Sequence, residues 1–190
     1  MVGIILGAGY ARRMGKDKLL LPFKETTIIE TIIKEGVASE LERIYLVCRD
    51  NQVKEIAKKY PIHVIINENA GEGQSTSIVK AMEAVGDIVP SYMFLMGDQP
   101  LISKDFINSM MDFYRQNHAS ILVPVYNGKP GTPTIFSNRW QEHLLKLKGD
   151  EGGRSIIRAH PKEVQLYPVE NGILGKDVDS LEQYIEILNL

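Results

Sequence analysis

Cysteine is almost absent from the 190-residue chain, in which Cys48 is the single example. One thiol cannot form a disulfide within the chain, so a reducing compartment is the simpler expectation. Cys48 lies in the apolar run 44–48, which is typical of a buried strand. We therefore expect a small core residue there rather than a nucleophile.

Long hydrophobic runs are missing as well. None reaches the roughly 18 residues that a membrane-spanning helix needs. The apolar run 2–8 precedes the charges of Arg12 and Arg13, whereas a secretory signal peptide has the opposite order. These features predict a cytoplasmic protein that does not act at a membrane.

Positive charge is not in excess either. The 22 Lys and Arg residues stand against 24 Asp and Glu, which gives a net charge of -2 and a pI of about 6.1. Proteins that coat nucleic acid need a surplus of basic residues, so we expect no nucleic-acid partner. The length and the 44% hydrophobic content fit one globular domain over residues 1–190.

No arrangement for covalent catalysis can be recognised. None of the histidines has metal-ligand spacing with a partner, and no Ser-His-Asp or Cys-His set can be placed. The four histidines are His63, His118, His143 and His160. The expected chemistry is therefore one that needs no nucleophile from the protein.

What the chain does have is an alternation of short apolar runs with segments of helical period. Ser103 and Ser180 can each cap a helix, and in the last helix Ile185 and Leu188 are expected to face inward. This alternation predicts an α/β sheet with helices on both faces and ligands beyond the carboxyl ends of the strands. The expected strands are 2–6, 43–49, 63–67, 92–96 and 120–125, and the expected helices are 51–59, 104–117, 181–188 and one beginning near Ile78.

Glycines and cations follow the first expected strand. Gly7 and Gly9 let the backbone approach a ligand, and four cationic side chains stand between Arg12 and Lys18. Backbone donors with Arg and Lys suit a triphosphate. The segment matches neither the Walker loop nor the dinucleotide fingerprint, in which a glycine stands where this chain has Arg12. A solvated basic turn is the alternative.

Asp98 follows the strand 92–96 at the ligand edge of the expected sheet. A carboxylate in this place can hold Mg²⁺ and bring it to phosphates, although it can also cap the turn before Pro100. Segment 71–77 lies between a strand and a helix, and its hydroxyls suit a base or ribose. Simple capping of that helix is an equal alternative.

Three further motifs are rich in glycine, proline or acidic residues. They are 128–133, 149–154 and 177–180. The first two lie within the expected loops 127–133 and 148–154. Locally, the pair Asp177 and Asp179 before Ser180 is more typical of a helix cap than of a metal site.

Four motifs taken together resemble a known family. They are 6–18 with its Gly-Ala-Gly, Arg13 and Lys18; Gly-Asp-Gln-Pro at 97–100; Gly-Asp-Glu-Gly-Gly-Arg at 149–154; and Asp-Val-Asp-Ser at 177–180. Their order is similar to that in the nucleotidyltransferases that mature the molybdenum cofactor, in particular the cytidylyltransferase branch. The resemblance runs from Ile4 to about Tyr184.

The resemblance implies a Rossmann-like nucleotide-diphospho-sugar transferase fold, a three-layer α/β/α arrangement with a mixed, mostly parallel sheet. It implies transfer of CMP from CTP to the terminal phosphate of molybdopterin, with release of pyrophosphate and with Mg²⁺ as cofactor. A recipient molybdoenzyme or its chaperone is a further expected partner.

The same resemblance implies roles for individual residues. Arg13, Lys18 and Asp98 would be catalytic, and Asp98 and Asp179 would bind the metal. The nucleotide would contact Leu6, Gly7, Ala8, Gly9, Arg13, Lys18, Asn67, Gly73, Ser75, Ser77, Gly97 and Asp98. The acceptor would contact Gly131, Thr132, Pro133, Gly149, Asp150 and Arg154.

Two positions depart from the family pattern. Ala-Ala-Gly is usual where this chain has Gly7-Ala8-Gly9, and Ala8 with Gln99-Pro100 favours CTP over GTP. Gly-His-Pro is common where this chain has Thr132 in the middle, which leaves the acceptor open. The alternatives are a guanylyltransferase for the same cofactor, a cytidylyltransferase for a sugar or polyol phosphate, and a nucleotide-binding cofactor chaperone. An NAD(P)-dependent oxidoreductase is disfavoured by Arg12 and Arg13 in the first loop.

Overall fold

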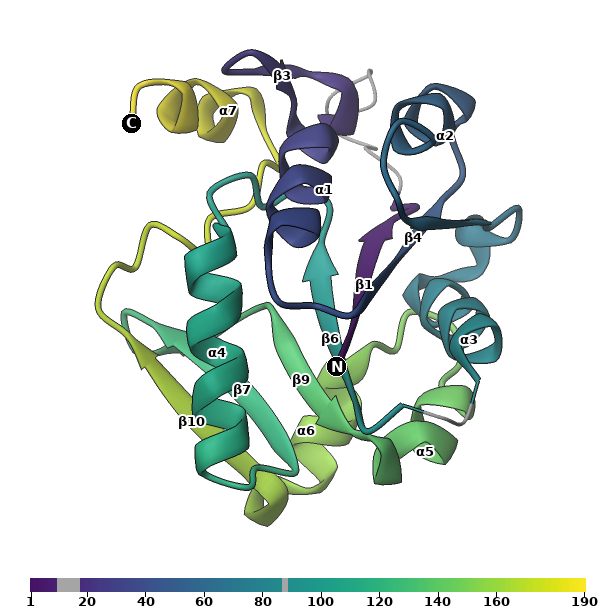
Figure 1. Ribbon diagram of the computed structural model, residues 1–190, viewed down its shortest axis with the longest axis vertical. Helices are drawn as coiled ribbons and strands as arrows, with labels where there is room; N and C mark the ends of the chain where they lie inside the picture. The colour runs from purple at the N-terminus through teal and green to yellow at the C-terminus, as the bar shows by residue number, and fades with distance from the viewer. Residues whose placement is uncertain (10–17, 87–88) are drawn as a thin grey trace.

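The computed structural model describes residues 1–9, 18–86 and 89–190, and its main feature is one mixed sheet (Figure 1). Within these residues eight strands join in the order β10-β7-β9-β6-β1-β4-β5, and β8 pairs with β7. All neighbouring pairs are parallel except those formed by β8 and β9. The strands are β1 Val2–Gly7, β4 Arg43–Cys48, β5 His63–Ile66, β6 Ser91–Met96, β7 Ile121–Tyr126, β8 Lys129–Pro130, β9 Thr134–Ser137 and β10 Val164–Val169.

Helices cover both faces of the sheet and create two cores. Side chains of β1 alternate between them, because Ile5 packs into one cluster and Ile4 into the other. The first cluster includes residues of α1 (Ile28–Ala38), α2 (Asn51–Ala57), α4 (Lys104–Gln116) and α7 (Leu181–Leu188). The second includes residues of α3 (Gln74–Val85), α5 (Gln141–Leu145) and α6 (Gly153–Ala159). The predicted three-layer α/β/α fold with a mostly parallel sheet is confirmed.

Short elements complete the described chain. A two-stranded sheet of β2 (Pro22–Phe23) and β3 (Thr26–Thr27) precedes α1. The 3-10 turns are η1 Lys18–Leu20, η2 Ala70–Glu72, η3 Asn138–Trp140 and η4 Pro161–Glu163. None of the described helices combines the length and the apolar character needed to cross a membrane.

The five predicted strands are all present, and their ends differ from the prediction by one residue at most. The hydroxyl of Ser103 caps α4 by accepting from the backbone of Phe106, as predicted. Cys48 is confirmed as a core residue: it is fully buried, and burial raises the pKa of its thiol to about 11. A thiol with so high a pKa is a poor nucleophile.

Several predictions about local structure are wrong. Helix α3 begins at Gln74 rather than near Ile78, so Ser75 and Ser77 lie in its first turn. The predicted loop 127–133 contains β8, which folds back on β7. The predicted loop 148–154 runs into α6 from Gly153 onward.

Helix α7 was expected to bury Ile185 and Leu188, and this is also wrong. These residues are 50% and 48% exposed, whereas Ile187 is 2% exposed and packs into the core. The hydroxyl of Tyr184 donates to the carbonyl of Pro22 at 2.6 Å. Because of this bond and the burial of Ile187, the helix turns the side of Tyr184 and Ile187 toward the protein and leaves Ile185 and Leu188 on its outer side.

Candidate nucleotide and metal site

The carboxyl ends of β1 and β6 lie side by side, and both strands point to the same edge of the sheet (Figure 1). Beyond them the pairing continues, because the N–H of Gly97 donates to the carbonyl of Leu6 at 3.0 Å. A Cβ at Gly97 would lie 2.9 Å from Ile29 and 3.2 Å from that carbonyl. Glycine at this position therefore brings Asp98 next to the loop that follows β1.

A cavity of about 280 Å³ opens at this edge. It is lined by the glycine-containing loop after β1 and by residues around the start of α3. Lys18, Asp98 and Asp150 add charged groups from three separate segments. The lining residues are Leu6, Gly7, Ala8, Gly9, Lys18, Leu19, Ala70, Gly71, Gly73, Gln74, Ser77, Met96, Asp98 and Asp150. Most of the residues expected to contact the nucleotide thus share one cavity.

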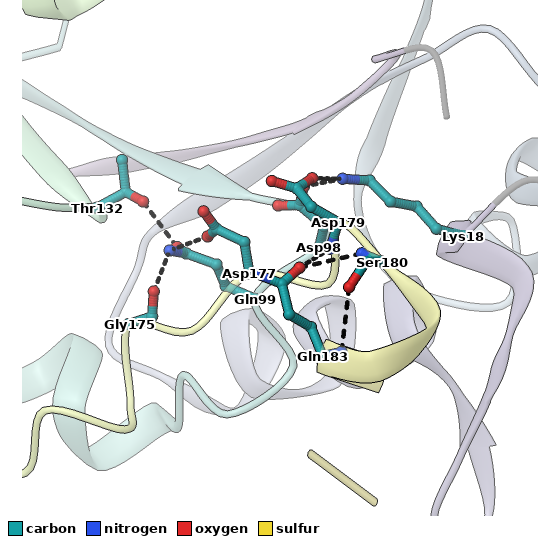
Figure 2. Close-up of polar contacts among 9 residues, drawn as sticks. All are labelled: Lys18, Asp98, Gln99, Thr132, Gly175, Asp177, Asp179, Ser180 and Gln183. Atoms are coloured by element: carbon teal, nitrogen blue, oxygen red, sulfur yellow. Dashed lines mark hydrogen bonds and ion pairs between the residues drawn. The ribbon is translucent and has the colours of Figure 1, made fainter. Parts of the chain in front are cut away.

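The Lys18 ammonium lies between two carboxylates at the edge of this cavity (Figure 2). Its Nζ is 2.5 Å from Oδ2 of Asp98 and 2.6 Å from Oδ1 of Asp179. Burial alone would lower the pKa of Lys18, but the charge of Asp98 and the hydrogen bonds with both carboxylates outweigh it and raise the pKa. Lys18 therefore carries a full positive charge at neutral pH.

The same two carboxylates fit a divalent cation. Oδ1 of Asp98 is buried and has no hydrogen-bond partner among the described residues, so one oxygen at the site is free to coordinate a ligand. Mg²⁺ prefers carboxylate oxygens, and it usually takes only one or two carboxylates from the protein together with phosphates and water. The described residues contain no cluster of three or more His, Cys, Asp or Glu side chains that could hold a metal. Such a metal would take its remaining ligands from water and, once the substrate is bound, from its phosphates.

Asp177 is a third carboxylate close to this pair. Burial, followed by the nearby charge of Asp98, raises its pKa to about 6. Its Oδ1 accepts a hydrogen bond of 2.7 Å from the Gln99 amide. Gln99 and Asp177 belong to the motifs 97–100 and 177–180, but no local pattern in the sequence predicts that their side chains bond to each other.

The start of α3 is held by backbone and side-chain bonds rather than left free. The carbonyl of Gly149 accepts from both the N–H and the hydroxyl of Ser75, at 3.1 and 2.7 Å. The amide of Asn67 donates to the hydroxyls of Thr76 and Ser77. Ser75 and Asn67 are buried and do not line the cavity, whereas Ser77 does. Ser75 and Asn67 thus support the cavity wall from beneath.

The residues expected to contact the acceptor make several different contacts in the structure. Asp150 lines the nucleotide cavity, and Gly149 supports α3. Pro133 is buried, and the hydroxyl of Thr132 donates to Gln99 at 2.8 Å. Gly131 packs against the ring of Tyr126, and Arg154 is exposed in the first turn of α6. Arg13, predicted to bind phosphate, lies outside the described residues.

A glycine loop, a half-buried lysine and paired carboxylates at the carboxyl edge of a mostly parallel sheet form an α/β site suited to nucleoside phosphates. The chain belongs to the family of MobA-like NTP transferase domains, which matches residues 3–164. It is therefore a nucleotidyltransferase.

Similar proteins cover almost the whole chain. The molybdenum cofactor cytidylyltransferase of Escherichia coli is 35% identical, over 96% of this chain and 92% of its own length. The purine catabolism protein PucB of Bacillus subtilis is 28% identical, over 97% of this chain and 94% of its own length. The crystal structure of Rv0371c from Mycobacterium tuberculosis has a TM-score of 0.89 at 24% identity and covers 100% of this chain and 97% of that one. The last likeness bears on the fold alone.

Proposed function

We propose that the protein transfers CMP from CTP to the terminal phosphate of the molybdenum cofactor and releases pyrophosphate. The observation that carries this proposal is Lys18 between Asp98 and Asp179, beside a cavity lined by the glycine loop. Similarity to the E. coli cytidylyltransferase supports the choice of CTP and of this acceptor.

In the proposed reaction an oxygen of the acceptor phosphate attacks the α-phosphorus of CTP. The bond between the α-phosphorus and the bridging oxygen breaks, and pyrophosphate leaves with that electron pair. The acceptor phosphate is already ionised at neutral pH, so no general base is needed. The protein's contribution is positioning and neutralisation of charge.

The residues of the cavity divide this work. Backbone N–H groups of Gly7, Ala8 and Gly9 would hold the phosphates, and Lys18 would neutralise them. Asp98 and Asp179 would hold Mg²⁺, which stabilises the negative charge that develops on the transferred and leaving phosphates. Ser77, which lines the cavity, would contact the ribose or the base.

The test is release of pyrophosphate from CTP, GTP and ATP, each with Mg²⁺ and with or without molybdenum cofactor. We expect release from CTP only when the cofactor is present, and loss of release in Asp98→Ala with the fold retained. Faster release from GTP would reassign the nucleotide. Release from CTP with a sugar or polyol phosphate instead would reassign the acceptor, and no release with any pair would favour a binding role.

A further inference from the structure

Gln99, the residue after Asp98, is buried at the centre of a network that joins three segments (Figure 2). Gln99 as a whole is 2% exposed. The amide Nε2 donates to the carbonyl of Gly175 at 3.0 Å and to Oδ1 of Asp177 at 2.7 Å. Its Oε1 accepts from the hydroxyl of Thr132 at 2.8 Å. Both the –NH₂ group and the oxygen of this amide are therefore hydrogen-bonded.

The partners on either side allow one orientation of the amide. A carboxylate and a backbone carbonyl can only accept, so the –NH₂ group must face Asp177 and Gly175. Thr132 is itself held in place, because the hydroxyl of Tyr126 donates to its carbonyl at 2.7 Å. The Thr132 hydroxyl then has the Gln99 oxygen as its acceptor. These hydrogen bonds connect Tyr126, Thr132, Gln99, Gly175 and Asp177, with Gln99 in the middle. We call this set of bonds the bracket.

This bracket is one of the constraints that place the second carboxylate of the metal site. The side chain of Asp179 is 51% exposed, so packing does not fix it. The segment that carries it is held at Gly175 and Asp177 by Gln99, and at the buried Val178, whose N–H donates to the carbonyl of Asp98 at 3.0 Å. The N–H of Asp179 also donates to the side chain of Gln183 at 2.8 Å. Two consecutive residues, Asp98 and Gln99, thus supply the first carboxylate and the attachment of the second.

We propose that Gln99 is a positioning residue that holds the Asp179 segment at the spacing at which one cation can bridge Asp98 and Asp179. Through Thr132 it also ties this segment to the side of the site where the acceptor is expected. The inference deepens the proposed function and depends on its metal site. It gives Gln99 no contact with the reacting atoms.

Binding of Mn²⁺ alone, followed by the loss of the free-ion EPR signal, tests this role without nucleotide or turnover. Removal of a residue that orients metal ligands weakens metal binding by about tenfold or more, so Gln99→Met should lower Mn²⁺ affinity by about tenfold. The matched control is Gln141→Met. Gln141 is also a buried glutamine, bonded to Tyr92 at the start of β6 and therefore at the opposite end of that strand from Asp98. It should lose comparable stability but keep Mn²⁺ affinity within about twofold.

Thr132 provides a second variant in case Gln99→Met does not fold. Thr132→Val removes the donor to the Gln99 oxygen and should weaken Mn²⁺ binding by about fivefold, the value of one hydrogen bond. Thr132→Ser keeps the hydroxyl and should bind Mn²⁺ like the wild type. In the double variant the two losses should not add, because both changes break the same chain of bonds.

The outcomes separate this inference from the proposed function. Folded Gln99→Met, or Thr132→Val if only that variant folds, with wild-type Mn²⁺ affinity would overturn the positioning role and leave the function intact. Mn²⁺ binding that depends on Asp98 and Gln99, without any pyrophosphate release, would overturn the function and leave the positioning role intact. Wild-type protein without Asp98-dependent Mn²⁺ binding would overturn both the metal site and the positioning role.

Discussion

At the scale of single residues, the site concentrates negative charge that is unfavourable for folding. Among the described residues, Lys18 pairs with Asp98 and Asp179, and no ion pair is formed by Asp177. Asp177 is left with a neutral donor, Gln99, and its pKa of about 6 shows that its ionised form is disfavoured. Functional sites commonly keep such unfavourable groups at a cost in stability.

Asp177→Asn should therefore stabilise the protein at neutral pH. The folded-state pKa of about 6 lies above the value of 3.8 for a free side chain, so the wild type loses stability as the pH rises from about 4 to about 6. Asparagine cannot ionise and still accepts from Gln99. We expect a melting temperature higher by roughly 3–6 °C at pH 7.5, with a smaller gain at pH 4.5.

Thermal unfolding across this pH range checks the prediction. Asp112→Asn is the control, because it removes an exposed carboxylate of α4 that pairs with Arg115, outside the cavity. An Asp177→Asn gain that stays constant from pH 4.5 to 7.5 would contradict the assigned cause.

Local motifs predict some site residues and not others. Gly7 ends the first apolar strand and Asp98 closely follows the strand that ends at Met96, where the fold class places ligands. Lys18 belongs to the basic segment that follows the first strand, so the chain order indicates all three. Gln99 and Asp177 act through each other across 78 positions of sequence. No local pattern reports a contact of that span. For the same reason Thr132, expected beside the acceptor, proves to donate to Gln99.

At the scale of elements, the connection from η2 to α3 depends on one close backbone contact. Gly73 has φ of +121° and ψ of 170°, a conformation that is essentially restricted to glycine. A Cβ there would lie 2.1 Å from the carbonyl oxygen of Gly149. That carbonyl also accepts the two bonds from Ser75, so the contact locks the 149–154 segment against the start of α3.

Gly73→Ala is expected to destabilise the protein by about 3 kcal/mol or more, because both the backbone angle and the Gly149 contact must change. Gly86→Ala is the matched control. It has φ of +71° and ψ of −169°, in the same glycine-restricted region, but a Cβ there would meet no atom of the described residues within 4 Å. Gly86→Ala should therefore carry only the backbone cost, about 1–3 kcal/mol. Urea unfolding of both variants provides the comparison. Equal losses would mean that the contact with Gly149 contributes nothing.

The sequence predicts whether a segment is a strand or a helix better than it predicts which side of a helix is buried. Strands 2–6 and 92–96 are predictable because apolar runs of this length between turns are typical of buried parallel strands. In α7, two stripes have helical spacing: Leu181, Ile185 and Leu188 form one, and Tyr184 with Ile187 the other. The second faces the core, and that choice depends on how segment 175–180 enters the helix. Periodicity carries no information about this entry.

At the scale of the whole molecule, the fold uses one edge of the sheet to bring distant segments together. Lys18, Asp98 and Asp179 come from the beginning, middle and end of the chain. Carboxylate oxygens of Asp98 and Asp179 lie 2.5 and 2.6 Å from the Lys18 Nζ. A divalent cation bound to both carboxylates would require metal–oxygen distances of about 2.1 Å, which leaves no space for the ammonium. Metal and Lys18 therefore exclude each other between these two oxygens.

This exclusion predicts how metal affects unfolding of the whole chain. A ligand of the folded state raises the melting temperature according to its affinity. To bind between these two oxygens in the wild type, Mn²⁺ must displace Lys18. Lys18→Met should therefore bind Mn²⁺ there about tenfold more tightly, which corresponds to about 1.4 kcal/mol. The rise caused by saturating Mn²⁺ should then be larger than in the wild type by roughly 3–5 °C.

The control must separate displacement from general electrostatics. Lys176→Met removes the same charge from the segment that carries Asp179, but Lys176 pairs with Glu186 rather than with the metal ligands. Its Mn²⁺-induced rise should match that of the wild type, because its charge does not occupy the metal position. If both lysine variants gain equally, long-range repulsion of the metal explains the result. If Lys18→Met gains nothing, the ammonium does not compete with the metal, and its place between Asp98 and Asp179 stabilises only the metal-free protein.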